Sequence, residues 1–202
     1  MNTNSNTYTI IYSIILVLVV AVSLTFVAMA LKPKQEDNIR IEKMQNILAS
    51  SHIEATVKDA IPLYDKYITK TFVVNSKGEE IPNVDAFTIN LASELKKPVD
   101  KQQLPVFIAT IEGIEYTILP VRGKGLWGPI WGYIALEEDY NTIYGVVFDH
   151  KSETPGLGAE INTPFFEDMF EGKQIFNEQG NFVSIGVLKG GASDDDMHAV
   201  DA

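Results

Sequence analysis

E-T-P-G-L-G-A, at residues 153–159, is the most distinctive short stretch of this chain. Its Gly156 and Gly158 follow a Thr-Pro pair, a composition typical of a tight turn. Such a turn can present backbone N–H groups and lets a ligand approach the main chain closely. An ordinary Pro-Gly turn uses the same residue types. The stretch therefore predicts an ordered turn and leaves open whether a ligand uses it.

The residues before this turn predict an antiparallel sheet. β-branched and aromatic side chains are concentrated at 106–111, 114–121, 130–136 and 142–148, and turn residues separate these runs. An earlier run at 68–74, followed by N-S-K-G, predicts a further strand. The alternation of strands and turns places the connection at 122–129 and the turn at 153–159 at one edge of the sheet. Trp127 and Thr154 are therefore expected at the same edge of the sheet.

The connection R-G-K-G-L-W-G-P at 122–129 combines three glycines, two cations and Trp127. Its spacing differs from that of a nucleotide P-loop, and no helical pattern follows it, which argues against that kind of phosphate site. Trp127 could cap the hydrophobic core, or it could form an aromatic wall for a planar ligand. The residue types leave both interpretations open.

Residues 164–170 predict a short helix, with Thr163 as N-cap, Pro164 in the first helical position and Gly172 past its end. Residues 182–188 predict one more strand before K-G-G at 189–191. The acidic run at 194–196 lacks the spacing of a calcium-binding loop and is expected to be a solvated loop. The apolar side chains of the short helix are expected in the core rather than around a cofactor; they are Phe165, Phe166, Met169 and Phe170.

The N-terminal part of the chain predicts a membrane anchor. Residues 10–31 are almost wholly apolar and would span roughly 33 Å as a helix, enough to cross a bilayer core. The alternative, a cleaved signal peptide, lacks support because no basic residues precede the apolar run. Residues 36–50 predict an amphipathic helix with an apolar face. That face consists of Ile41, Met44, Ile47 and Leu48.

These patterns divide the chain into four parts: a tail at 1–9, a transmembrane helix at 10–31, a helical connector with the start of the soluble domain at 32–103, and the main soluble domain at 104–202. The predicted fold class is α+β, with a mainly antiparallel sheet. Basic residues near the anchor are Lys32, Lys34 and Arg40, mixed with acidic ones. Taken alone, they weakly favour a cytoplasmic soluble domain.

The composition excludes several classes of function. A formal net charge of -11 over 202 residues argues against nucleic acid as a partner, because phosphate contacts need clustered Lys and Arg. The absence of cysteine excludes disulfides, thiolate nucleophiles and Cys-bound clusters or zinc. The three histidines are far apart in sequence, so no metal site is predicted.

Four motifs together resemble the covalent-FMN-binding domain family: G-K-G-L-W at 123–127, E-T-P-G-L-G-A at 153–159, K-G-G at 189–191 and H-A-V-D-A at 198–202. This family includes flavin subunits of the sodium-translocating NADH:quinone oxidoreductases and of the Rnf complexes. The resemblance covers the anchor, the helix after it and residues 104–202. The run G-L-W-G-P-I-W-G favours the NADH:quinone oxidoreductase branch.

The resemblance implies that FMN is attached through its phosphate to a threonine in a D-[GA]-x-S-G-A-T signature, by a separate flavin transferase. Asp201 and Ala202 resemble the first two positions of that signature, so the threonine is expected just after Ala202. The alternative is a version of the protein that cannot be flavinylated. Around the flavin ring, the resemblance implies contacts from Thr154, Gly156, Leu157 and Gly158, with Glu153 beside them, from Leu126 and Trp127 on the other face, and from Lys189 near the phosphate.

Membership of that family would make the chain an electron carrier in a sodium-pumping respiratory complex of the bacterial inner membrane. Its partners would be the other subunits, the flavin transferase and the lipid bilayer. The family also implies a periplasmic soluble domain, against the weak count of basic residues. The alternatives are an Rnf-type subunit, a flavin-free scaffolding domain, and a domain that binds a planar ligand without a covalent bond.

Overall fold

The computed structural model describes residues 5–193 and 196–201. It separates into two compact units, Met1–Glu42 and Lys43–Ala202. Asp194 and Asp195, in the acidic run expected to be a solvated loop, lie outside the described residues, as do residues 1–4 of the predicted tail and Ala202. The functional questions concern the second unit, because all the predicted flavin-binding residues belong to it.

The first unit consists of most of helix α1 (Asn6–Ala49), a helix of 44 residues. The predicted transmembrane and amphipathic segments are both parts of this one helix, which continues through Pro33. Pro33 cannot donate a backbone hydrogen bond, so the helix lacks one bond of its ladder there. Among the described residues, α1 is the one helix long and apolar enough to cross a membrane by length and composition.

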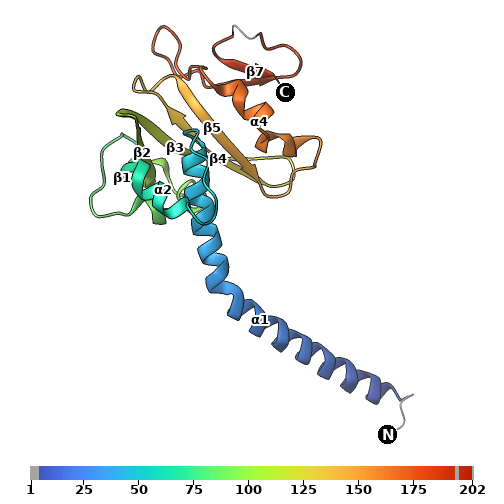
Figure 1. Cartoon of the computed structure of the whole chain (residues 1–202). Helices are drawn as coiled ribbons and strands as arrows, with labels where there is room; N and C mark the ends of the chain where they lie inside the picture. The colour runs from blue at the N-terminus through green and yellow to red at the C-terminus, as the bar shows by residue number, and fades with distance from the viewer. Residues whose placement is uncertain (1–4, 194–195, 202) are drawn as a thin grey trace. The chain divides into compact units, whose positions relative to one another are not determined.

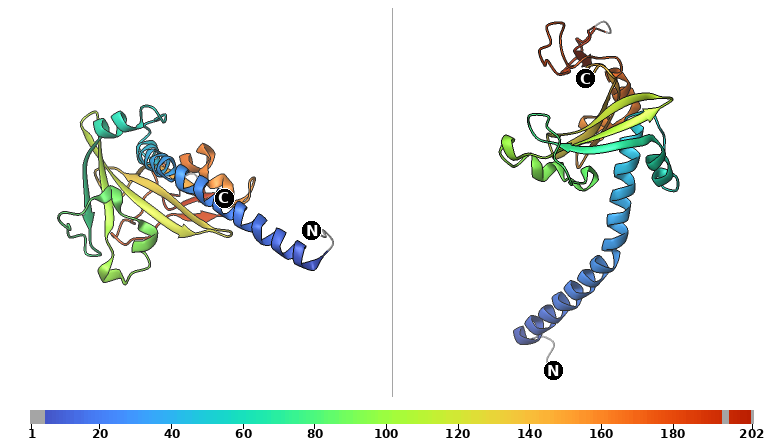
Figure 2. Two further views of the ribbon diagram at one scale, coloured as in Figure 1. Left: turned by 90° about the horizontal axis from the view of Figure 1, so that it is seen from below. Right: turned by 90° about the vertical axis from the view of Figure 1, so that its left-hand side faces the viewer.

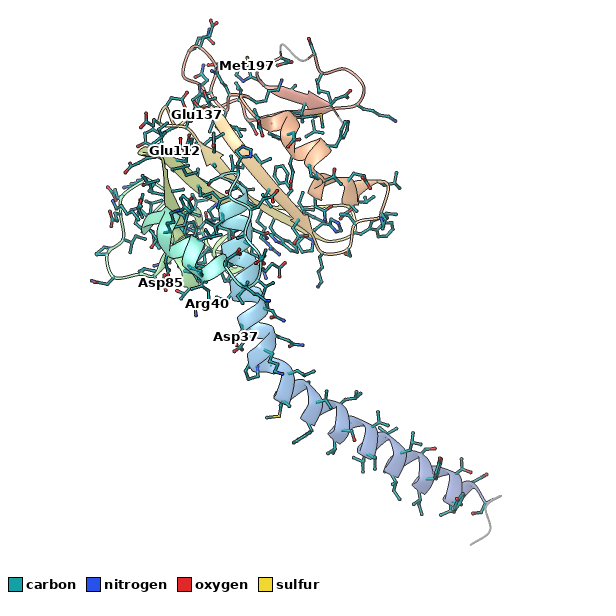
Figure 3. All side chains as sticks on the ribbon, in the orientation of Figure 1. Asp37, Arg40, Asp85, Glu112, Glu137 and Met197 are labelled. Carbon is teal, nitrogen blue, oxygen red and sulfur yellow. The ribbon has the colours of Figure 1, made fainter. Side chains whose placement is uncertain are left out.

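The last turns of α1 belong to the second unit and are buried there. Met44, Ile47 and Leu48 lie at helical spacing and are at most 3% exposed. This confirms three of the four residues of the predicted apolar face; the fourth, Ile41, is half-buried. Lys43 donates a hydrogen bond to the carbonyl of Phe87 and lies over the Phe87 ring, 4.5 Å from its centroid. Burial lowers the pKa of Lys43, an effect that the Asp85 carboxylate, labelled in Figure 3, partly opposes.

The centre of the second unit is a five-stranded antiparallel sheet in which strand order follows sequence order (Figure 1). Each strand pairs with the next, so every connection is local except the long one between β1 and β2. The prediction of an antiparallel sheet is confirmed. The strands are β1 (Ile68–Val74), β2 (Leu104–Ile111), β3 (Ile114–Lys124), β4 (Pro129–Leu136) and β5 (Ile143–His150).

The sheet has two ends with different turns. Glu112 and Gly113 both have positive φ, 53° and 89°, as a two-residue hairpin between right-twisted strands requires. Glu112 and Glu137 mark the β2–β3 and β4–β5 turns at one end of the sheet (Figure 3). Because the strands are antiparallel, the β3–β4 connection and the segment after β5 lie at the opposite end.

Short elements cover the remainder of the sheet. Before the β2 strand these are α2 (Ala60–Tyr67), η1 (Ala86–Thr88), α3 (Leu91–Glu94) and η2 (Val99–Lys101). After β5 they are η3 (Gly158–Asn162), α4 (Pro164–Glu167), η4 (Asp168–Phe170), β6 (Gly186–Leu188) and β7 (Ala199–Asp201). Figures 1 and 2 show the C-terminal elements, in orange and red, on the β5 side of the sheet. Strands β6 and β7 form a separate parallel pair.

Three local predictions for the C-terminal part need correction. Thr163 occupies the N-cap position of α4, but its hydroxyl donates to the carbonyl of Glu160 and does not cap the helix. Phe165 is 82% exposed, so its predicted core position is wrong, whereas Phe170 is buried as expected. Within residues 182–188, only Gly186–Leu188 is a strand; Phe182 forms an isolated bridge with Phe176.

Candidate functional site

Two glycine-containing loops meet at one end of the sheet. The loop at 125–128 connects β3 to β4, and the turn at 153–158 follows β5. The Glu153 carboxylate accepts hydrogen bonds from the backbone N–H groups of Trp127, at 2.9 Å, and Gly128, at 3.1 Å. The Ser152 hydroxyl donates to the carbonyl of Trp127 at 3.1 Å. These bonds confirm that the two loops meet, as the order of strands and turns predicts.

The glycines of the two loops are required by close packing. A Cβ on Gly125 would lie 2.4 Å from Oε1 of Glu153 and 2.9 Å from the carbonyl oxygen of Gly128. A Cβ on Gly128 would lie 2.6 Å from the Ser152 hydroxyl, and one on Gly158 would lie 2.9 Å from Oε2 of Glu153. Each of these distances is too short for a side chain without movement of the partner. The loops are therefore fitted to each other around Glu153.

The turn at 153–159 uses part of its own hydrogen-bonding capacity. The N–H groups of Leu157 and Ala159 both donate to the carbonyl of Thr154, and the N–H of Gly156 donates to the Glu160 carboxylate at 2.8 Å. These three N–H groups do not face a ligand, contrary to the expectation for the turn as a whole. Within the described part of the chain, the N–H groups of Thr154 and Gly158 have no partner. These two N–H groups can donate hydrogen bonds to a ligand.

An apolar cavity of about 440 Å³ lies against the turn. Leu157 and Gly158 form one side of it, and strands β4 and β5 contribute Ile130 and Phe148. Its lining exposes almost no polar atoms. The sequence predicts two of the lining residues, Leu157 and Gly158, as flavin contacts. The other lining residues were not predicted as site residues, because a strand or helix pattern shows which side chains face the core and not which of them contact a ligand. These residues are Ile130, Phe148, Glu160, Ile161, Phe166, Phe170 and Val187.

Three large apolar side chains of the two loops are exposed. Leu126 is 82% exposed, Trp127 is 68% exposed and Leu157 is 72% exposed. Trp127 therefore does not cap the core, and the first of its two sequence interpretations is wrong. Of these three side chains, Leu157 lines the apolar cavity, whereas Leu126 and Trp127 line a separate hollow formed by residues 123–129. Exposed apolar side chains around a cavity, as at Leu157, are typical of a binding site for a planar, partly apolar ligand.

Lys189 lies next to the C-terminal strand. It follows β6 directly and is exposed. Val187, two residues earlier, lines the cavity, and its neighbour Leu188 pairs with Asp201 of β7. The N–H of Gly190 donates to the Asp201 carboxylate at 2.5 Å. The motifs K-G-G and H-A-V-D-A are thus adjacent in space as well as close in sequence.

Glu167 of α4 supports the β5 wall of the cavity, a role that its sequence pattern did not indicate. Its carboxyl group accepts a hydrogen bond from the Phe148 N–H at 2.6 Å. Burial raises the pKa of Glu167 above its usual range. The bond from Phe148 opposes this shift, and the charges of Asp168 and Asp149 add to it. The Phe148 ring packs against those of Phe166 and Phe170.

The variant Glu167→Gln is expected to be more stable than the wild type at neutral pH. Because the folded-state pKa is raised, the stabilising contribution of Glu167 is present below the unfolded-state pKa and is lost as pH rises through the folded-state pKa. Glutamine stays neutral and can still accept the Phe148 bond. Melting temperatures measured between about pH 4 and 8 should therefore diverge in favour of the variant as pH rises.

Glu94→Gln is the matched control, with the opposite sign. Lys97 bonds both oxygens of Glu94 at 2.8 Å, and this bond is the main reason that the pKa of Glu94 is lowered. Its stabilising contribution is present above the unfolded-state pKa and is lost as pH falls through the folded-state pKa. The control variant should therefore melt below the wild type at neutral pH. Equal melting curves for Glu167→Gln and the wild type at every pH would contradict the prediction.

Comparison with known proteins agrees with this site. Residues 125–202 match the FMN-binding domain family, a range that contains every predicted flavin contact. The chain is 30% identical to NqrC, a subunit of the Na(+)-translocating NADH-quinone reductase, from Haemophilus ducreyi, over 99% of this chain and 83% of that protein. It is 29% identical to the corresponding subunit of Pseudomonas aeruginosa, over 94% of this chain and 80% of that protein.

A solved structure supports the same relationship. The crystal structure of NqrC from Parabacteroides distasonis has a TM-score of 0.78 and 40% sequence identity, and the match covers 85% of this chain and 83% of that one. This chain therefore combines its similarity to these relatives with an apolar cavity, two closely packed glycine-containing loops and an apolar N-terminal helix. The chain belongs to the NqrC family of subunits of the Na⁺-translocating NADH-quinone reductases.

Proposed function

We propose that this protein is the subunit that carries electrons through a bound FMN in a sodium-translocating NADH:quinone reductase. The observation that carries the proposal is the apolar cavity beside residues 153–158, inside the stretch that matches the FMN-binding domain family. Electron flow from NADH to quinone and its coupling to sodium export belong to the whole complex. This chain would hold one of the redox groups through which the electrons pass.

The residues around the cavity fit FMN in size and chemistry. A volume of about 440 Å³ lies within the range of small-molecule sites, roughly 300–1,000 Å³. The apolar lining suits the flat face of an isoalloxazine ring. The partnerless N–H groups of Thr154 and Gly158 suit its carbonyl and nitrogen edge. Lys189 and the two glycines after it would lie at the phosphate end.

When bound, FMN supplies one-electron and two-electron redox chemistry that no side chain of this protein can supply. The protein would bind the FMN and adjust its reduction potential. The apolar side chains exclude water from the ring, and the N–H donors favour electron density at the ring edge that they face. Leu126 and Trp127 would contact the other face of the ring, and because both side chains are exposed, that face would stay accessible to a partner subunit. No general acid, base or nucleophile is needed.

Covalent attachment of the flavin is part of the proposal. The family resemblance implies an acceptor threonine in the signature whose first position Asp201 matches, and Asp201 of β7 pairs with Leu188, the residue before Lys189. A separate flavin transferase would form the phosphoester. Because such a tether holds the phosphate, the ring does not need a fully closed pocket.

The proposed partners are the other subunits of the complex and the lipid bilayer. Helix α1 provides the apolar segment for an inner-membrane anchor. The soluble unit is proposed to lie on the periplasmic side, in line with the family resemblance. The three basic residues near the anchor, mixed with Glu36 and Asp37, carry little weight against this orientation.

The test is denaturing gel electrophoresis of the full-length protein from its native membrane, viewed under ultraviolet light before staining. We expect a fluorescent band at the mass of this protein, because a covalent flavin survives denaturation. Replacement of the acceptor threonine by alanine should abolish the fluorescence and leave the stained band unchanged. A dark wild-type band, from a host with an active flavin transferase, would refute the covalent-flavin function.

A further inference from the structure

We infer that Glu153 is a positioning residue that fixes the spacing between the two loops of the flavin site and acts on the flavin through them. The inference rests on the proposed function, and it gives a specific role to Glu153, which the family resemblance places in the cofactor site beside the ring contacts. Its side chain points into the protein: the residue is 8% exposed, whereas its neighbours Ser152 and Thr154 are exposed.

The contacts of Glu153 explain why this position carries a carboxylate. Oε1 accepts from two successive N–H groups, those of Trp127 and Gly128, and these residues lie 26 and 25 positions away in sequence. A carboxylate oxygen can accept two such bonds at once, and bonds to a charged acceptor are stronger than neutral ones. The N–H of Glu153 donates in turn to Nδ1 of His150 at 3.3 Å.

The second oxygen of Glu153 lies against Gly158 of the other loop. A Cβ on Gly158 would have three nearest neighbours, and all three are atoms of Glu153: Oε2 at 2.9 Å, Cβ at 3.4 Å and Cδ at 3.6 Å. Gly158 lines the cavity and offers one of the two partnerless N–H groups. One side chain thus links the exposed Trp127 on one loop to a flavin donor on the other.

This arrangement gives Glu153 two of the three hydrogen bonds that join residues 127–128 to residues 152–153, the third coming from the Ser152 hydroxyl. Loss of the carboxylate leaves the N–H groups of Trp127 and Gly128 without their partner and frees space beside Gly158. The flavin would then occupy a looser and more variable environment. A tether through the phosphate does not correct this, because it holds the opposite end of the cofactor.

The test compares four variants of the full-length protein isolated from its native membrane. Glu153→Ala removes the link, and Glu153→Gln keeps an oxygen that can accept both N–H bonds. Gly158→Ala keeps Glu153 but pushes its Oε2 away. Asp139→Ala is the matched control, because Asp139 is an exposed carboxylate that also accepts two backbone N–H bonds, from Asn141 and Thr142, but in the β4–β5 turn at the opposite end of the sheet.

The first readout is hydrogen exchange of the amides at residues 125–128, which does not depend on flavin. Glu153→Ala should speed this exchange about tenfold, equivalent to about 1.4 kcal/mol. Glu153→Gln should speed it less, because its neutral oxygen still accepts both bonds, and Asp139→Ala should leave it close to wild type. Unchanged exchange in Glu153→Ala would overturn the inference. If that variant does not accumulate, Gly158→Ala with faster exchange supports the inference, and Gly158→Ala with wild-type exchange overturns it.

The second readout is the flavin itself, through its visible circular dichroism and midpoint potential. Glu153→Ala and Gly158→Ala should weaken the dichroism and move the potential toward that of free FMN, and Glu153→Gln should restore both. Wild-type dichroism and potential in Glu153→Ala, with only a lower melting temperature, would overturn the inference. A dark wild-type band in the denaturing gel refutes the proposed function and the flavin part of the inference, while the exchange result still decides whether Glu153 links the loops.

Discussion

Replacement of Phe170 by alanine is expected to lower the free energy of unfolding by about 3 to 4 kcal/mol, because a buried phenylalanine loses its transfer free energy and leaves a cavity. Phe170 is 6% exposed and packs with Leu136, Ile143, Val146 and Val200. Its ring also contacts those of Phe148 and Phe166, at centroid distances of 5.2 and 5.3 Å.

The same substitution should alter the flavin site, because Phe170 lines the apolar cavity. The cavity becomes larger and less well packed, so we expect weaker visible dichroism of the flavin as well as a lower midpoint of denaturant unfolding. The control is Phe165→Ala, in α4, which directly precedes the η4 turn that contains Phe170. Phe165 is 82% exposed, so its loss should change stability by no more than about 0.5 kcal/mol. Equal effects of the two variants would contradict the structure.

Gly132→Ala is expected to destabilise the protein by about 3 kcal/mol, at the upper end of the range for overpacking. A Cβ at this position would lie 2.2 Å from the carbonyl oxygen of Val147 and 2.7 Å from Cδ1 of Phe148. The nearest atom belongs to the backbone of β5, so a side-chain rotation cannot relieve the clash. Strands β4 and β5 must separate where they support the flavin cavity.

Gly123→Ala is the matched control for this prediction. Gly123 lies on β3 of the same sheet, and a Cβ there would make ordinary contacts of 3.5 and 3.7 Å with the Ile130 side chain. Thermal unfolding should show a large loss for Gly132→Ala and a change within about 0.5 kcal/mol for Gly123→Ala. A Gly132→Ala protein with the wild-type melting temperature would show that β4 and β5 are not packed as described.

The sheet was predictable from sequence because its signals are local. The run at 68–74 corresponds to β1, and Glu112-Gly113 is the hairpin turn between β2 and β3. The order of strands and turns also predicts that Trp127 and Thr154 lie at the same edge of the sheet. Each of these inferences depends on neighbouring residues or on the alternation of antiparallel strands, so no information about distant side chains was needed.

Burial around α4 was less predictable. Phe165, Phe166 and Phe170 all fit a helical apolar face, yet α4 has only four residues before the chain tightens into η4. A period of 3.6 residues cannot be resolved over a single turn. The direction of Phe165 therefore depends on how the turn docks against β5, which the sequence pattern does not contain.

The detailed chemistry of the site was the least predictable part. Glu153 looked like a neighbour of the flavin, but its partners are N–H groups about 25 residues away whose direction depends on the loop conformation. The cavity-lining Ile130 and Val187 belong to strands, where alternation separates two faces without indicating which face carries a ligand. The family resemblance pointed to the two loops, and the structure supplies their contacts.

The parallel pair of β6 and β7 has a consequence for the order in which the molecule matures. The five main strands pair with their sequence neighbours, a topology of local contacts that folds early. Val187 of β6, by contrast, shares the cavity wall with Ile130 of β4, which lies far earlier in the chain. The wall of the flavin pocket therefore depends on contacts between segments that are distant in sequence, so we expect the sheet to form first and the pocket to be completed on a sheet already in place.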